Sequence, residues 1–176
     1  MTLKFSCVAA CLIAVSGCSS GGDVLTAASA SATPIATPAP TAAGTAPPAA
    51  PTNTSFAGML NGVRANVGAG AVTYDARLGQ AAQGHADDML ANGYFSHTGL
   101  DGSNAGDRIR ATGYVPRAWG ENLARGQQSE AEVLEAWQNS PSHRTSNENP
   151  NFEDFALSRA GSGAQTYWVL VFGSEQ

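Results

Sequence analysis

The most restrictive feature of this 176-residue sequence is the apolar run near its end, TYWVLVFG. From Tyr167 to Phe172 every position is apolar, whereas a strand with one face in water alternates apolar and polar residues. The strand predicted here must therefore be covered on both faces. The segment FALSRA precedes it, and Gly161, Ser162 and Gly163 separate the two. That arrangement predicts a β-hairpin.

Helical patterns come before the hairpin. Apolar residues recur at helical spacing from Phe56 to Val67. A second helix is predicted from Asp75, a residue type that caps helix N-termini, to Gly93, a residue type that ends helices. A short third helix is predicted over residues 105–112.

A fourth helix is predicted to begin at Ser129, which forms the capping-box pattern with Glu132. Its expected apolar face comprises Val133, Ala136 and Trp137. A further turn begins at Ser140, the expected helix cap, with Pro141 in the first helical position. Because helices come first and a buried sheet last, we predict an α+β fold with three layers, an α-β-α sandwich.

The N-terminal segment, residues 1–18, is predicted to be a lipoprotein signal peptide. Lys4 precedes an apolar run that ends in Val-Ser-Gly-Cys, and this run is too short to span a bilayer. The ending resembles a bacterial lipobox, in which Cys18 would receive a lipid anchor. The alternative is an ordinary cleaved signal. Cys7 and Cys11 also lie in this segment, so a domain processed at Cys18 has no disulfide.

Residues 19–53 are predicted to be a disordered tether rich in Ala, Pro and Thr. Six of the nine prolines fall between Pro34 and Pro51, and large apolar side chains are nearly absent. At about 3 Å per residue the tether could hold the folded domain up to about 100 Å from a membrane. We expect the folded domain to comprise residues 54–176.

The charge of the chain disfavours nucleic-acid binding. Its formal net charge is -5, Lys4 is its one lysine, and its eight arginines are scattered. A basic stripe of the kind that tracks a phosphate backbone cannot form from these residues.

Three short motifs contain the candidate site residues: FSHT with His97, WGENLA with Glu121, and SPSHR with His143. Imidazoles and a carboxylate are the parts of a metal site or an acid/base site. The spacings match no local zinc motif, so the fold must assemble any such site. For Glu121 a structural role in its glycine-flanked loop competes with a functional one. His85 belongs to the apolar face of the second helix, and we interpret it as a core or boundary residue rather than a ligand.

The order of these motifs resembles the CAP superfamily of SCP-like extracellular proteins. The resemblance extends over residues 54–173, through YDARLGQAAQGHADDM, GYFSHTGLDGS, DRIRATGY, WGENLARG, VLEAWQNSPSHR, NPNF and YWVLVFG. The disulfide-free bacterial branch fits best. The resemblance implies an α-β-α sandwich with a cleft. That cleft usually holds a His-Glu-Glu-His tetrad, which can bind zinc in some members.

The resemblance transfers three of the four tetrad positions to this chain. They are His97, Glu121 and His143. The second glutamate falls on Ser140, three residues after Trp137, as is usual in bacterial members. Glu135 precedes Trp137 by two residues and should point elsewhere on a helix. Residues 145–148 and 155–158 also depart from the family pattern, which affects the expected floor of the cleft.

We therefore expect an exported, membrane-tethered binding module in the cell envelope. The motifs favour a non-catalytic protein over an enzyme. His97 and His143 would be zinc ligands, and two ligands fall short of the three or four of tight zinc sites. One alternative is a hydrolase, either metal-assisted or of Ser-His-Glu type with Ser140 as nucleophile. The chain contains neither HExxH nor G-x-S-x-G. The other alternative is lipid or sterol binding.

Overall fold

The structure is a computed structural model, and it describes residues 51–176. The predicted signal peptide, its lipidation site Cys18 and the tether up to residue 50 lie outside the described residues. The helices are α1 (Pro51–Asn66), α2 (Ala76–Asn92), α3 (Ala105–Ala111), α4 (Glu130–Gln138), α5 (Pro141–Asn147) and the 3-10 turn η1 (Gly163–Gln165). The strands are β1 (Thr73–Tyr74), β2 (Pro116–Arg125), β3 (Asp154–Ala160) and β4 (Tyr167–Glu175).

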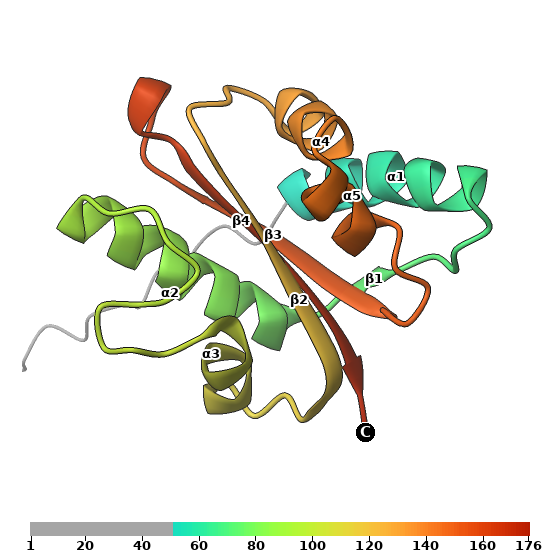
Figure 1. The fold of residues 1–176 in the computed structure, drawn as a ribbon, viewed down its shortest axis with the longest axis horizontal. Coiled ribbons are helices and arrows are strands. Elements are labelled where there is room, and N and C mark those ends of the chain that lie inside the picture. The colour runs from blue at the N-terminus through green and yellow to red at the C-terminus, as the bar shows by residue number, and fades with distance from the viewer. Residues whose placement is uncertain (1–50) are drawn as a thin grey trace, which may run out of the picture. The chain divides into compact units, whose positions relative to one another are not determined.

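The four strands form one sheet in the order β1-β3-β4-β2 (Figure 1). Strands β3 and β4 are the predicted hairpin and pair antiparallel. Strand β2 pairs antiparallel with β4 along its length, and the two-residue β1 pairs parallel with β3. Strand β2 is thus an edge strand, and its outer side faces no other strand of this sheet.

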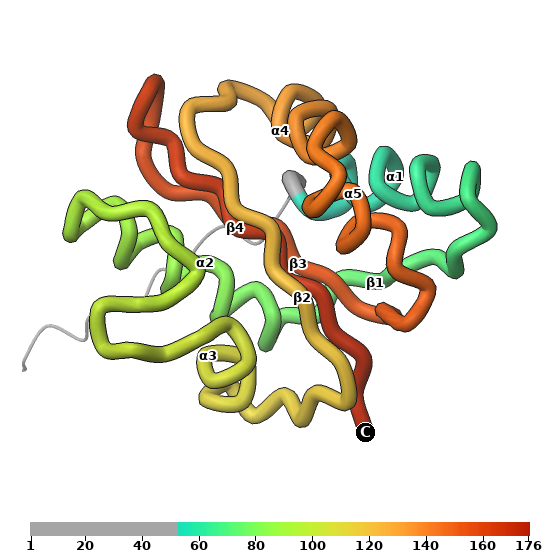
Figure 2. The backbone as a smooth tube through the Cα atoms, viewed as in Figure 1, coloured from blue at the N-terminus to red at the C-terminus, as the bar shows by residue number. Residues whose placement is uncertain are grey.

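Helices cover both faces of the sheet, which confirms the three-layer α+β prediction. Helices α2 and α3 lie on one side, and α1, α4 and α5 lie on the other (Figures 1 and 2). One apolar cluster joins Phe56 of α1 and Trp137 of α4 to Phe155 and Leu170 of the sheet. A second joins the other face to α2 and α3. Strand β4 is buried at every position but its last, as the apolar run predicts.

The predicted ends of α2 are confirmed. The Asp75 side chain accepts hydrogen bonds from the backbone N–H groups of Arg77 and Leu78, and Gly93 takes a left-handed conformation with φ +67°. An L-residue with a side chain adopts that φ only at a cost. After Gly93 the backbone folds back along α2 before it enters α3 (Figure 2).

Two local predictions were wrong in detail. At Ser129 the hydroxyl caps Glu132 N–H, but the Glu132 carboxylate accepts from Gln128 N–H, so the reciprocal bond of a capping box is missing. A complete capping box instead joins Asn104 and Asp107 at α3. Leu134 takes the buried place on α4 that the pattern assigned to Ala136.

Two further deviations concern helix termini. Ser140 occupies the N-cap position of α5, and Pro141 follows as predicted, yet the Ser140 hydroxyl makes no capping bond. It lies 3.5 Å from the Ser142 hydroxyl instead. Val67 is 53% exposed because α1 ends one residue before it.

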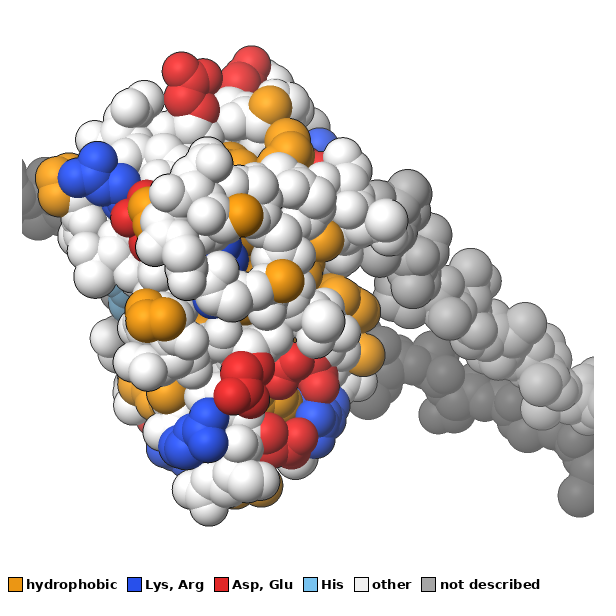
Figure 3. Space-filling model, turned by 90° about the vertical axis from the view of Figure 1, so that its right-hand side faces the viewer, with side chains coloured by type: hydrophobic (Ala, Val, Ile, Leu, Met, Phe, Trp, Pro, Cys, Tyr) orange, Lys and Arg blue, Asp and Glu red, His pale blue; other side chains and the backbone are white. Residues whose placement is uncertain are grey.

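The surface carries mixed charge. On the face shown in Figure 3, basic and acidic side chains lie next to one another in one cluster, with apolar atoms scattered elsewhere. The ion pairs of Arg77 with Asp75 and Glu175 are of this mixed kind. None of the helices in residues 51–176 combines the length and apolarity needed to span a bilayer.

Candidate functional site

The candidate site lies at the edge strand β2, where Glu121 and Asn122 are successive residues. Successive side chains of a strand point to opposite faces of the sheet. Glu121 therefore lies on the face of Leu123, which packs with α2 and α3, and Asn122 lies on the face of α5. The prediction that Glu121 belongs to a loop was wrong, because WGENLA is paired to β4 throughout. Groups from both faces of the sheet can thus meet at this edge.

The Glu121 carboxylate is the centre of the site. Its side chain is 2% exposed, and its two oxygens have different partners. One oxygen lies 2.8 Å from His97 Nδ1, and the other accepts a 2.7 Å hydrogen bond from the Arg108 guanidinium. The structure thus places the carboxylate between an imidazole and a guanidinium that is itself only 13% exposed. The cation offsets much of the cost of burying the carboxylate.

This contact decides which nitrogen of His97 carries a proton. An ionised carboxylate only accepts hydrogen bonds, so His97 Nδ1 must be the donor. In the neutral ring Nε2 is then the acceptor. The His97 side chain is 59% exposed, so the ring extends from a buried, charge-balanced anchor into solvent. A carboxylate on one ring nitrogen orients the other toward a ligand, as happens in many metal sites.

Arg108 connects three parts of the site. Besides Glu121, its guanidinium donates to the backbone oxygens of His97 and Ser103, at 3.2 and 3.0 Å. It thereby fixes the loop that carries His97 to α3 and to β2. Sequence reasoning missed this role, although Arg108 lies in the quoted motif DRIRATGY. The available signal was a basic residue on a short helix directly after the histidine loop.

His143 lies on α5, on the opposite side of β2. The Asn122 amide donates to the His143 backbone oxygen and to the Asn147 side-chain oxygen, both at 2.9 Å. Those two bonds hold the helix against the strand. Burial, and then the nearby positive charge of His97, lower the pKa of the His143 imidazole. The Asn122 bonds therefore place the helix that carries His143 against the strand that carries Glu121.

Arg64 anchors the far end of α5, and sequence reasoning did not single it out. This side chain is completely buried. Its guanidinium donates to the backbone oxygens of Asn147, Asn149 and Phe152, and its Nε donates to that of Gly70. The C-terminal carbonyls of a helix carry partial negative charge and suit a cation. Desolvation lowers the pKa of Arg64.

His85 is a core residue, as predicted. It is 1% exposed, and its Nε2 donates to the Ser96 backbone oxygen at 2.8 Å. Burial, followed by the nearby Arg108 charge, lowers its pKa, so the neutral ring is favoured. His85 thus supports the loop beside His97.

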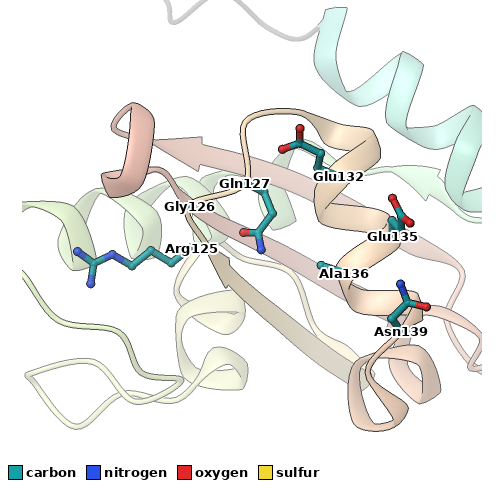
Figure 4. Close-up of a pocket in the computed structure, with 7 residues that line it drawn as sticks. All are labelled: Arg125, Gly126, Gln127, Glu132, Glu135, Ala136 and Asn139. Carbon is teal, nitrogen blue, oxygen red and sulfur yellow. The ribbon is translucent and has the colours of Figure 1, made fainter.

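Ser140 and Glu135 have no contact with the imidazoles or with Glu121 among the bonds of residues 51–176. Glu135 is exposed on α4. It lines a pocket of about 570 Å³ with Gln127, Glu132 and Asn139 (Figure 4). Figure 4 shows Gln127 pointing toward α4 and Arg125 pointing away from it. A second pocket of about 470 Å³ lies between α2 and the loop 99–103, with His85 and Arg108 in its wall. Neither pocket contains His97, Glu121 or His143.

A zinc ion fits these residues only in part. His97 Nε2 is oriented by Glu121 in the manner of a metal ligand, and His143 would be the second donor. Within residues 51–176 no three or more His, Cys, Asp and Glu side chains are grouped so that they could hold a metal. Because tight protein zinc sites use three or four ligands, the residues present favour weak binding at most.

The architecture and the order of motifs agree with a comparison to known families. The family model described as CAP, cysteine-rich secretory protein family, matches residues 57–172. The chain belongs to the CAP family. Among curated proteins it is 31% identical over 114 residues to the uncharacterized protein YkwD of Bacillus subtilis (strain 168), covering 65% of this chain and 44% of YkwD.

A second relative is the uncharacterized membrane protein YlbC of the same bacterium, 30% identical over 86 residues, covering 49% of this chain and 25% of YlbC. The chain thus spans less than half the length of the curated relatives it matches. Two solved structures share the fold of this CAP domain. An outer surface protein from Borrelia burgdorferi superposes with a TM-score of 0.65 and 23% identity, covering 70% of this chain and 92% of that one. An extracellular protein with an SCP domain from Bacillus anthracis superposes with a TM-score of 0.63 and 24% identity, covering 69% of this chain and 40% of that one.

Proposed function

We propose that this protein is an exported CAP-domain binding module whose ligand contacts His97 and His143 at the edge of β2. The observation that carries the proposal is the chain of contacts from Arg108 through Glu121 to His97 Nδ1. Among residues 51–176, no hydrogen bond is made to Nε2 of this exposed imidazole. The helix that carries His143 is held against the same strand by Asn122. The buried Glu121–Arg108 pair holds the His97 ring in one orientation. The entropic cost of ordering the ring when a ligand binds is therefore lower.

A binding role explains the site better than catalysis does. A Ser-His-Glu hydrolase requires a hydroxyl within hydrogen-bond reach of the imidazole. Ser140, the candidate nucleophile, contacts the Ser142 hydroxyl, and its bonds among residues 51–176 include neither imidazole. A metal-assisted hydrolase would need a firmly held metal, which two imidazoles do not supply.

Lipid or sterol binding is also less well supported. Such a ligand needs a largely apolar cavity. The pocket beside α4 is lined mainly by polar side chains, among them Gln127, Glu132, Glu135 and Asn139. The pocket behind Arg108 carries Asp88 and Asp101.

Export is supported by the names of structural relatives, an outer surface protein and an extracellular protein. The predicted lipobox would attach the chain to a membrane through Cys18. Replacement Cys18→Ser should release the protein into the soluble fraction in its host. Unchanged membrane retention of that variant would disprove the anchor and leave the binding site unaffected.

Zinc titration by calorimetry tests the imidazole pair. The wild-type chain should bind weakly, and the double variant His97→Ala with His143→Ala should give no binding heat. Glu135→Ala is the matched control, since it removes an exposed carboxylate outside the site. Affinity should weaken below about pH 6.5, where a free imidazole takes up a proton. Identical heats from wild type and double variant would remove metal binding from the proposal.

Peptide and ester hydrolysis assays test the non-catalytic part of the proposal. We expect no turnover above background. Turnover that disappears in Glu121→Gln would contradict a binding module and establish an enzyme, because that change removes the charge that orients His97.

A further inference from the structure

We propose that the ligand of this site is an extended peptide that pairs as an additional strand with the free edge of β2. This inference rests on the proposed function and specifies its ligand class. It follows from the direction of the backbone groups of β2 and from which of them are already bonded.

Two bonds establish that direction. Each residue of an antiparallel strand points its N–H and C=O to one side, and successive residues alternate. Gly126 N–H donates to Thr166, on the side of β4, at 2.8 Å. The Leu123 oxygen instead accepts a 3.0 Å bond from the Trp137 indole, on the outer side. Trp119 and Glu121 lie four and two residues before Leu123, so their N–H and C=O groups point to the same side as those of Leu123, away from β4.

These outward groups are accessible at Glu121. Its side chain is only 2% exposed, yet the residue as a whole is partly exposed. The accessible surface of Glu121 must therefore belong largely to its backbone. Among residues 51–176, no loop backbone or side chain bonds to the outward N–H or C=O of Trp119 or Glu121. The edge of the sheet is thus open between the loop that carries His97 and helix α5, which carries His143.

Both ends of this edge are protected, and its middle is not. Exposed edges normally carry proline, charge or a covering element, because unpaired strands aggregate. Pro116 has no N–H, Arg117 adds a charge, and Trp137 covers the Leu123 oxygen. The open stretch from Trp119 to Glu121 suits one short extended segment.

The flanking side chains define what such a peptide should carry. With Nδ1–H donated to Glu121, neutral His97 offers Nε2 as an acceptor. A hydroxyl-bearing residue, serine or threonine, supplies the matching donor. Trp119 is 42% exposed at the same edge and offers an apolar contact to a nearby side chain. We therefore expect a partner protein with an extended segment that contains serine or threonine between apolar residues.

Fluorescence anisotropy with a labelled synthetic peptide, acetyl-Val-Thr-Val-Thr-Val-Lys-amide, tests this inference on the full wild-type chain. The peptide should bind, and an analogue N-methylated at every internal amide should bind much more weakly, because it cannot donate to the strand edge. Equal binding of the two peptides, or no binding of either, would overturn strand pairing. This comparison needs no variant protein.

A pair of variants at one position provides the second arm. Proline at 119 removes an outward N–H that β4 does not use, and edge strands tolerate proline there. Trp119→Pro should bind the peptide about 2- to 10-fold more weakly than Trp119→Ala, the equivalent of one net hydrogen bond. Equal affinities would contradict the inference. Sedimentation equilibrium provides a third arm, since a dimer that Trp119→Pro dissociates would identify a second copy as the occupant and overturn the peptide.

Failure of this inference and failure of the proposed function are distinguishable. If His97→Ala with His143→Ala abolishes peptide binding while N-methylation has no effect, the binding module stands and strand pairing falls. If peptide binding survives loss of both imidazoles but is weakened by N-methylation of the peptide, strand pairing stands and the proposed role of the imidazoles falls.

Discussion

Replacing Arg108 by methionine should destabilise the fold far more than a surface substitution. The change leaves the Glu121 carboxylate, which is 2% exposed, without its cation. Removing one partner of a buried ion pair costs about 3–5 kcal/mol. Arg108 retains 13% exposure, and water could enter the space it leaves. We therefore expect the lower end, about 3 kcal/mol of the free energy of unfolding.

Urea unfolding followed by tryptophan fluorescence measures this loss, with the denaturation midpoint compared at constant slope. Arg110→Met is the matched control. Arg110 lies on the same helix, is 56% exposed, and has only a 3.7 Å contact with Asp107. Its loss should change stability by no more than about 0.5 kcal/mol.

A double variant separates the charge effect from lost packing. Once Glu121→Gln has removed the charge, Arg108→Met should lower the free energy of unfolding by at least about 1 kcal/mol less than it does in the wild type. Two results would show that the buried pair does not organise the site. One is an equal loss of unfolding free energy in Arg108→Met and Arg110→Met. The other is a loss in the double variant that equals the sum of the losses in the two single variants.

Three further predictions follow from the helix ends and from His143. Ser129→Ala should destabilise α4 by about 1 kcal/mol, because it removes a capping bond to Glu132 N–H, whereas Ser140→Ala should be nearly neutral in the same urea assay; equal losses would show that Ser140 does cap α5. Gly93→Ala should cost about 1 kcal/mol, since its φ is +67°, and a neutral result in thermal unfolding would contradict that conformation. Burial and His97 lower the pKa of His143, so the unfolded chain takes up a proton that the folded chain does not, and stability falls as pH drops below about 6.5. That fall should be shallower in His143→Asn when thermal unfolding is compared between about pH 7.5 and 5, and an unchanged slope would refute the assignment.

The fold could largely be predicted from local patterns. The run from Tyr167 to Phe172 required cover on both faces, and the helix caps Asp75 and Gly93 marked the bounds of α2. These signals are readable because burial and capping depend on residue type and on spacing along the chain. Strand β2 was missed because WGENLAR reads neither as a regular alternation nor as an apolar run. Its glycine and asparagine indicated a turn, and pairing with β4 overrode them.

The candidate site was predictable only in its three titratable residues, and those came from motif order. The sequence contains His97, Glu121 and His143 but no indication of which faces they occupy. Arg108 and Asn122, which hold these residues in place, looked like ordinary polar residues. Their roles depend on contacts between elements 13 and 21 residues apart.

By itself, the sequence determined the layers of this protein, the termini of most helices, and the identity of the groups that can bind protons or ligands. Only the tertiary structure decided that a buried carboxylate balances an arginine against a histidine, and that the strand beneath them keeps an open edge. The physical reason is that apolar patterning acts along the chain, whereas charge compensation and unpaired backbone groups depend on which elements become neighbours in space.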